Sequence, residues 1–206
     1  DIPAHGVVNV HPSLLPLYRG PTPMQAAIRD GVTRTGVSMI TLDALMDHGP
    51  IFAQKEIVLD ADETTETLTR KVFDVGAPLL VDVLRDIANG TMSATEQDDN
   101  KATTCGLLTR EDGIIDWNAS AKEIERMIRA YTPWPGTSTG SLKIFSASIT
   151  SELLTPGIAH IAGDRLLVGT GTTALEIHEL QSAGGKRMKA AAFVCGNRGI
   201  DSSTFS

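Results

Sequence analysis

The first half of the chain is best understood from one stretch, Asn9-Val-His-Pro-Ser-Leu-Leu-Pro-Leu-Tyr-Arg-Gly20. It begins within an apolar segment, 7–11, that predicts a β-strand. Asn9 and His11 lie two positions apart, so their side chains leave the same face of that strand. An amide can donate to a developing oxyanion, and an imidazole can do so when protonated or move a proton when neutral. The stretch therefore predicts a sheet that carries a site for polarising a carbonyl group.

Helical and strand-like segments alternate after this stretch. Thr22, Pro23 and Gly31 stand in the order of a cap, a first-turn proline and a terminating glycine, which predicts a short helix between them. Strands are expected over 36–42 and 51–59, where apolar residues alternate or run together.

A long amphipathic helix is expected next. Thr64 can cap it, and apolar residues then recur at spacings of three and four. Pro78 should kink this helix, and Asn89-Gly90 should end it. Strands interleaved with helices predict an α/β layer arrangement for residues 1–90.

The second half has a different pattern. Residues 91–106 lack periodicity and predict a linker, and Ser120 and Glu123 form a capping box before a helix that reaches Tyr131. Beyond Gly199 the chain is polar and is expected to be disordered. Short β-prone runs separated by glycine-rich turns predict a small barrel, and they cover 143–149, 157–161, 165–168 and 174–180.

The composition is that of an ordinary globular protein, with 41% hydrophobic and 21% charged residues. A net charge of −7 argues against nucleic-acid binding driven by bulk charge, although residues 107–206 hold 10 basic and 10 acidic groups. Cys105 and Cys195 are far apart and outside any CxxC pattern, which favours two free thiols and a reducing, cytoplasmic compartment. No stretch approaches the ~20 apolar residues of a membrane helix.

Asp47 lies in a polar loop and could orient the His11 imidazole, raising its pKa by charge pairing. Alternatively, Asn9 caps a turn and His11 is a satisfied core residue. A metal site is not expected, because the five histidines have no recognisable ligand spacing and His48 is the one possible ligand.

The quoted stretch, together with Met46-Asp-His-Gly-Pro50, resembles the signature of folate-dependent formyltransferases. The resemblance implies that Asn9, His11 and Asp47 are catalytic and that 10-formyltetrahydrofolate is the co-substrate. It also implies the back portion of a Rossmann-like catalytic domain, with folate contacts from Ser13, Leu14, Leu15 and Pro16. Formyl transfer passes through a tetrahedral intermediate, so Asn9 and a protonated His11 would stabilise its oxyanion while Asp47 would help to move the proton.

Three segments of the second half resemble the C-terminal domain of the methionyl-tRNA formyltransferase family: 107–117, 128–136 and 180–188. The resemblance implies an OB-like barrel over 107–206 that holds initiator methionyl-tRNA in translation initiation, and a monomeric protein. Trp134 is expected to be a packing residue that stabilises its turn rather than a platform for base stacking. The candidate phosphate contacts are Arg126, Arg129, Lys186, Arg187 and Lys189.

The resemblance also implies that a family member has a substantial further segment before the position of Asp1. A partial sheet leaves one wall of the folate pocket missing, so we expect this chain alone to be weakly active or inactive. Two alternatives remain open at this stage. One is another folate enzyme, either a hydrolase that releases formate from 10-formyltetrahydrofolate or another folate-dependent formyltransferase. The other is a non-catalytic tRNA-binding module, a remnant of such an enzyme.

Overall fold

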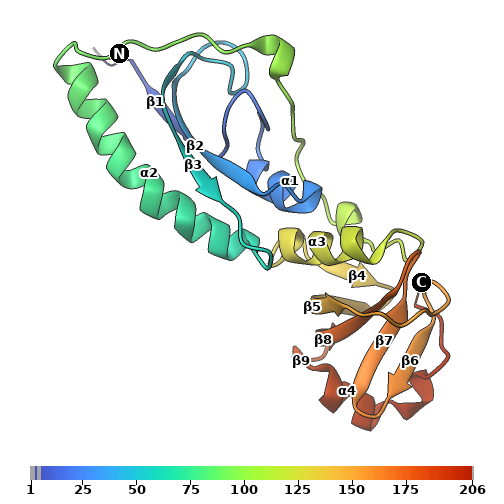
Figure 1. Cartoon of the computed structure of the whole chain (residues 1–206). Helices are drawn as coiled ribbons and strands as arrows, with labels where there is room; N and C mark the ends of the chain where they lie inside the picture. The colour runs from blue at the N-terminus through green and yellow to red at the C-terminus, as the bar shows by residue number, and fades with distance from the viewer. Residues whose placement is uncertain (1–2, 4–5, 206) are drawn as a thin grey trace. The chain divides into compact units, whose positions relative to one another are not determined.

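Three antiparallel strands organise the first part of the chain in the order β1-β2-β3 (Figure 1). The computed structural model describes residues 3 and 6–205, and they divide into two units at Leu107. The strands are β1 (Val8–His11), β2 (Arg34–Thr41) and β3 (Ile51–Val58). The expected strands are thus present, with ends shifted by two residues or fewer. Residues 35–40 of β2 are buried without alternation, which is the pattern of a strand covered on both faces.

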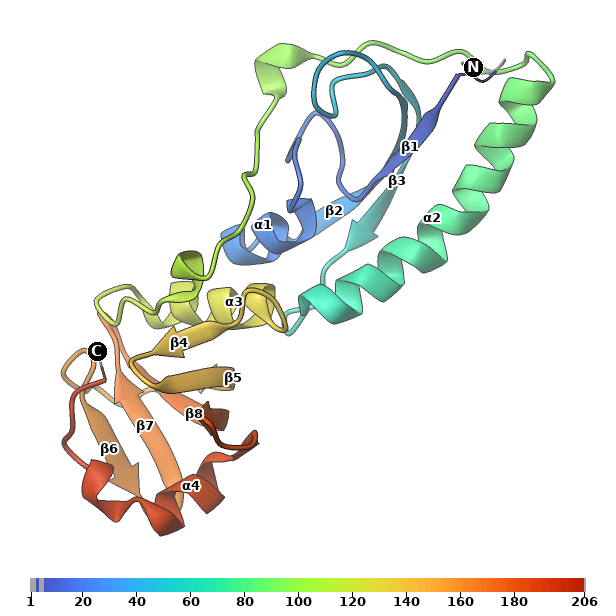
Figure 2. The ribbon, with the colours of Figure 1, turned by 180° about the vertical axis from the view of Figure 1, so that it is seen from behind.

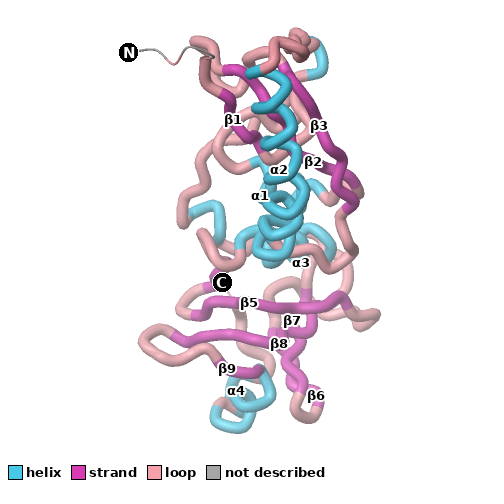
Figure 3. The backbone as a smooth tube through the Cα atoms, turned by 90° about the vertical axis from the view of Figure 1, so that its left-hand side faces the viewer, coloured by secondary structure: helices cyan, strands magenta, loops and turns pink. Residues whose placement is uncertain are grey.

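Helix α2 (Thr65–Ala88) covers one face of this sheet (Figures 1 and 3). It begins at the expected cap, where the Thr64 hydroxyl accepts from the Thr67 N–H, and it continues through Pro78. Gly76 brings the helix close to the sheet, because a Cβ there would lie 3.4 Å from a methyl group of Val37. The apolar stripe of the sequence is therefore the face that is buried.

The shorter helix α1 (Pro23–Asp30) ends at Gly31, whose φ of 68° is left-handed. Thr22 is the N-cap residue of this helix as predicted, but its side chain makes no capping hydrogen bond. Its hydroxyl donates instead to the carbonyl of Gly106, 2.8 Å away.

The segment over 91–106, whose composition predicts a linker, belongs to the first unit and pairs with it at several points (Figure 2). Thr95 exchanges backbone hydrogen bonds with Ile51, and Thr104 forms a parallel bridge with Arg19. A short 3-10 helix, η1 (Asp99–Lys101), lies between these contacts. A segment that pairs through its backbone does not need a periodic pattern of apolar side chains. Composition and periodicity therefore do not reveal such pairing.

The second unit is an antiparallel sheet packed against two helices, α3 (Ala121–Tyr131) and α4 (Ala190–Gly196). The capping box of Ser120 and Glu123 starts α3 as predicted. Two 3-10 turns accompany the helices, η2 (Glu111–Gly113) and η3 (Arg198–Ile200). The strands are β4 (Thr137–Thr139), β5 (Leu142–Ile149), β6 (Ala159–Ala162), β7 (Arg165–Gly169), β8 (Ala174–Ser182) and β9 (Met188–Lys189).

The strand order is β4-β5-β8-β7-β6, with β9 on β8. No ladder joins β4 to β6 among the described residues, so the predicted closed barrel is not observed. Apolar side chains of α3, α4 and the sheet form one core, which includes Ile124, Ile128, Ile144, Leu166, Ile177 and Phe193.

The expectation of a disordered tail beyond Gly199 is wrong for the residues that the structure describes. Phe205 is only 7% exposed, and its ring centroid lies 6.2 Å from that of Trp117. The backbone N–H of Phe205 donates to the carbonyl of Gly157 at 2.7 Å. A single aromatic residue thus anchors a polar segment, which average composition does not register.

Cys105 and Cys195 are both free thiols. None of the helices in the described part of the chain is long and apolar enough to cross a membrane.

Candidate active site

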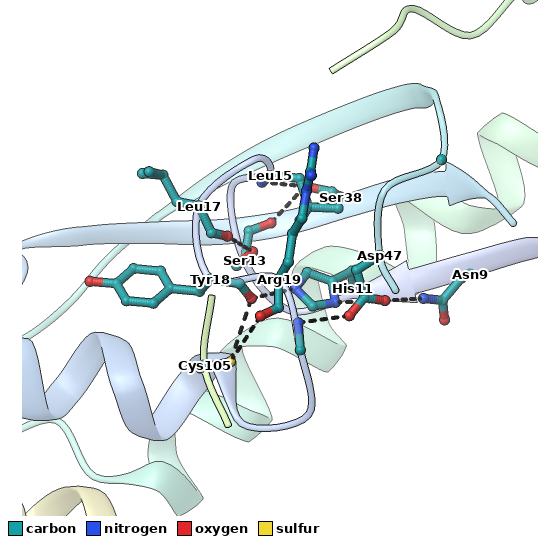
Figure 4. A network of polar contacts seen from close by, with 12 residues as sticks. Asn9, His11, Ser13, Leu15, Leu17, Tyr18, Arg19, Ser38, Asp47 and Cys105 are labelled. Atoms are coloured by element: carbon teal, nitrogen blue, oxygen red, sulfur yellow. Dashed lines mark hydrogen bonds and ion pairs between the residues drawn. The ribbon is translucent and has the colours of Figure 1, made fainter. Parts of the chain in front are cut away.

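The carboxylate of Asp47 joins three parts of the first unit (Figure 4). Its Oδ1 accepts from the Asn9 side-chain amide at 3.3 Å and lies 3.5 Å from Nδ1 of His11. Its Oδ2 accepts from the backbone N–H of Gly20 at 2.8 Å. The structure thus brings together the three residues proposed from the sequence, although Asn9 and Asp47 are 38 positions apart.

Strand β1 positions the imidazole of His11, which is only 3% exposed. Its Nε2 lies 3.0 Å from the carbonyl oxygen of Tyr18. A carbonyl oxygen can only accept a hydrogen bond, so Nε2 carries a proton in this arrangement. The Nδ1 atom consequently faces Asp47 and is the atom available for further proton transfer.

Burial lowers the pKa of His11, and this effect is larger than the opposing effects of the Asp47 charge and the Tyr18 carbonyl. The expectation that Asp47 raises the pKa of His11 overall is therefore wrong, because desolvation outweighs charge pairing. The separation of 3.5 Å from Asp47 is also longer than an ordinary hydrogen bond. The site at neutral pH accordingly holds a neutral imidazole.

The backbone around the His11 imidazole adopts conformations that are strained or open only to glycine. Tyr18 and Asp47 have φ angles of 59° and 51°, in the left-handed region that non-glycine residues seldom adopt. Such conformations cost about 1–3 kcal/mol each and persist where surrounding contacts hold them. Gly20 has a φ of 121°, and a Cβ at this position would lie 2.1 Å from the carbonyl oxygen of Cys105. These backbones direct the Tyr18 carbonyl toward His11 and the Gly20 N–H toward Asp47.

Hydrogen bonds to the sheet anchor the segment 13–16, which the sequence assigns to folate contact. Ser13 is fully buried, and its hydroxyl donates to the carbonyl of Leu17 at 2.6 Å. The hydroxyl of Ser38 donates to the Ser13 carbonyl and accepts from the Leu15 N–H. Leu14 and Pro16 alternate with these buried residues and are partly exposed.

The sequence does not point to several residues that support the site. Gln54 donates to the Leu15 carbonyl and to the Ser38 hydroxyl, and Gln97 contacts the backbone of the loop that carries Asp47. A lone glutamine in a strand or an irregular segment has no sequence signature, so local pattern could not have found either residue.

His48 neighbours Asp47 but turns toward other acidic groups. Its Nδ1 lies 2.6 Å from Asp43, and its Nε2 lies 3.4 Å from Asp99. The hydrogen bond with Asp43 is the main reason that the pKa of His48 is raised. No cluster of three or more His, Cys, Asp or Glu residues suited to a metal ion occurs in the part of the chain that the structure describes.

The candidate phosphate contacts of the second unit fall into two groups. Arg187 and Lys189 both pair with Glu179, and the Arg187 guanidinium stacks 4.5 Å from the ring centroid of Phe145. Lys186 is exposed in the turn before β9. Arg126 and Arg129 lie instead on α3, where Arg129 forms a two-point contact with Glu125.

Trp134 is 53% exposed, so it is not the packing residue that was expected. The guanidinium of Arg110 lies 6.0 Å from its ring centroid.

Two family models match the chain. A formyl transferase model covers residues 1–84, and a model of the formyl transferase C-terminal domain covers residues 107–198. Solved structures with the same fold include HypX from Aquifex aeolicus in complex with tetrahydrofolic acid (TM-score 0.71, 20% identity, 91% of this chain and 34% of that one). An N-formyltransferase from Helicobacter canadensis is similar (TM-score 0.71, 19% identity, 88% and 66%). The chain is thus a formyltransferase in fold.

Relatives with higher identity define the family. A methionyl-tRNA formyltransferase of Herpetosiphon aurantiacus is 41% identical over 207 residues, covering 97% of this chain and 68% of the relative. Those of Roseiflexus castenholzii and Chloroflexus aggregans are 45% and 46% identical, covering 92% and 95% of this chain. The chain belongs to the methionyl-tRNA formyltransferase family. The chain spans 63% of the length of the Roseiflexus castenholzii relative and 66% of the length of the Chloroflexus aggregans relative.

Proposed function

We propose that this chain carries the catalytic residues for transfer of a formyl group from 10-formyltetrahydrofolate to the amino group of initiator methionyl-tRNA. The observation that carries the proposal is the shared contact of Asp47 with Asn9 and His11. Family membership supports the choice of both substrates. The reaction belongs to translation initiation, and we place the protein in the cytoplasm as a monomer.

The attacking amine forms a bond to the formyl carbon, and the carbonyl oxygen becomes an oxyanion. One hydrogen of the Asn9 amide is directed at Asp47, which leaves the second to donate to this oxyanion. Neutral His11 accepts the proton of the amine at Nδ1 and returns it to the folate nitrogen as the bond from carbon to that nitrogen breaks. Asp47 stabilises the transient imidazolium by charge. No step requires a metal ion.

The buried residues Ser13 and Leu15 hold the folate-contacting segment against the sheet, while Leu14 and Pro16 supply its accessible surface. The second unit, whose six-stranded sheet we take as the OB-like domain, would bind the tRNA backbone. Its phosphate contacts would come from Arg126, Arg129, Lys186, Arg187 and Lys189. Residues 1–90 would form part of the catalytic domain, with 91–106 connecting it to the tRNA-binding domain over 107–206.

The direct test is transfer of labelled formyl to methionyl-tRNA. Because the chain spans about two thirds of the length of the Chloroflexus aggregans relative, it is assayed alone and joined to the part of that relative that it lacks. The family resemblance places that part before Asp1, so it is added at the N-terminus. We expect the extended chain to be active, the chain alone to be weak or inactive, and His11→Ala and Asn9→Ala to abolish transfer. Equal activity of both chains would contradict the expected need for the preceding segment.

Two results would replace this function by another. Release of formate that does not depend on tRNA would indicate a hydrolase. Binding of tRNA without transfer, unaffected by His11→Ala, would indicate a non-catalytic binding module.

A further inference from the structure

The side-chain amide of Gln97 bridges two segments of the active site. Its Nε2 donates to the carbonyl oxygens of Asp47 at 2.9 Å and of Gly49 at 2.8 Å. Its Oε1 accepts from Nε and Nη2 of Arg19, at 3.0 and 2.8 Å. Arg19 belongs to the stretch that follows His11, so one glutamine ties that stretch to the loop that carries Asp47.

Every hydrogen-bonding position of this amide is used. A glutamine side chain has two N–H donors and an oxygen with two lone pairs. The two carbonyls can only accept and the guanidinium can only donate, so the orientation of the amide follows from its partners. Gln97 is also half-buried, whereas its immediate neighbours Glu96 and Asp98 are exposed.

The loop that carries Asp47 is held by polar contacts, while the segment before Asp47 is not packed. Residues 42–46 are exposed, including the large apolar side chains of Leu45 and Met46. Asp47 itself holds a left-handed φ of 51°, which costs free energy unless contacts enforce it. Gly49 lies so close to the sheet that a Cβ would be 1.9 Å from the Thr41 carbonyl. The bonds from Gln97 fall on the two residues, Asp47 and Gly49, where the loop conformation is most restricted.

We propose that Gln97 is a positioning residue for formyl transfer, holding the backbone of Asp47 and Gly49 so that the Asp47 carboxylate meets Asn9, His11 and the Gly20 N–H. The inference rests on the proposed function, because it assigns Gln97 to the same reaction. Arg19 orients the glutamine from the other side and is itself held by Asp99, whose Oδ1 lies 2.7 Å from its Nη2.

The kinetic test compares Gln97→Glu and Gln97→Met in the N-terminally extended chain. Gln97→Glu keeps the shape but places acceptors against two carbonyls, and Gln97→Met removes all four bonds. We expect kcat for formyl transfer to fall about tenfold to hundredfold in both variants, while KM for the folate changes by less than about threefold. Gln181→Glu is the matched control, because Gln181 belongs to the second unit, where its amide donates to the Gly185 carbonyl. A kcat equal to that of the control overturns the proposal.

A second measurement needs no activity and uses the chain alone. The Asp47 charge raises the pKa of His11 against the effect of burial, so displacement of Asp47 should lower that pKa further. NMR titration of the His11 imidazole should show this decrease in Gln97→Met, which adds no charge. Asp47 is the charged side chain that pairs with His11. Arg19 contacts Gln97 and pairs with Asp99, which also pairs with His48, and the substitution replaces none of these charged groups. His48 pairs in turn with Asp43, which is likewise kept.

An unchanged His11 pKa in folded Gln97→Met overturns the positioning role whether or not the extended chain transfers formyl. Gln97→Asn provides the same test with an amide that is one methylene too short to reach both segments. Circular dichroism of each variant verifies that the chain is folded. Absence of transfer by the unsubstituted extended chain, with a lowered His11 pKa in Gln97→Met, would instead refute the proposed function and retain the structural role of Gln97.

Discussion

The Nδ1 atom of His11 lies 3.5 Å from Oδ1 of Asp47, but this close carboxylate does not keep the imidazole charged. Burial lowers the pKa of His11 by more than Asp47 raises it. The pair therefore combines a neutral base with an anion that can stabilise the base once it is protonated. That combination suits a reaction in which the imidazole first takes a proton and then returns it.

The lowered pKa of His11 links stability to pH. The unfolded chain binds the proton more readily than the folded chain, so the stabilising contribution is present above the ordinary histidine pKa and is lost as pH falls through that value and the folded value below it. We expect the free energy of unfolding to fall more steeply with acidification in the parent chain than in His11→Gln. Urea unfolding at a series of pH values measures both slopes. The raised pKa of His48 makes an opposite contribution to the pH dependence of stability, but this contribution is the same in both chains. Parallel curves of unfolding free energy against pH would therefore contradict the prediction.

Gly20→Ala should lower the free energy of unfolding and disturb the hydrogen bond from the Gly20 N–H to Asp47. Its Cβ would lie 2.1 Å from a backbone oxygen at a φ of 121°, which requires the backbone to move. We expect a loss of at least about 2 kcal/mol in the free energy of unfolding, measured with urea. Gly106→Ala is the control, because a Cβ there meets nothing within 4 Å, and its effect should stay within about 0.5 kcal/mol. Similar losses in both variants would be inconsistent with the packing described.

Phe205 should stabilise the second unit. Its ring is buried beside Trp117, so Phe205→Ala leaves a cavity and should cost about 3 kcal/mol. Leu153→Ala serves as the control, because Leu153 is 78% exposed and its truncation should change stability by less than about 0.5 kcal/mol. Chemical unfolding followed by tryptophan fluorescence gives both values. A neutral Phe205→Ala would mean that the terminal segment is not anchored as described.

Binding of tRNA should depend on Lys186 and Arg187. Each phosphate contact that is lost should reduce the slope of log Kd against log salt by about 1. We expect this reduction in Lys186→Ala, and a smaller one in Arg187→Ala and Arg129→Ala, because Glu179 and Glu125 already hold those two guanidinium groups. Filter binding at several salt concentrations measures the slopes. Lys55→Ala is the control, because it removes an exposed charge from β3 in the first unit. An equal reduction of the salt slope in Lys55→Ala would show that tRNA binding depends on net charge alone.

The local sequence was sufficient to predict those elements that are determined by interactions between residues close together in the chain. The Ser120 and Glu123 capping box starts α3, and Gly31 ends α1, because caps involve atoms within one turn of the chain. The shared face of Asn9 and His11 follows in the same way from the alternation of a strand. The fit of Asn9, His11 and Asp47 to a known motif extended this local reasoning to the site.

Contacts between distant segments were decided by the tertiary structure alone. Gln97 meets the Asp47 carbonyl across 50 positions, and Phe205 reaches Trp117 from a segment that composition assigns to disorder. The protonation of His11 depends on how deeply the folded chain buries it, and the open edges of the second sheet depend on which strands find partners. Burial and long-range pairing are properties of the packed chain, because each is set by atoms that no local window of residues contains.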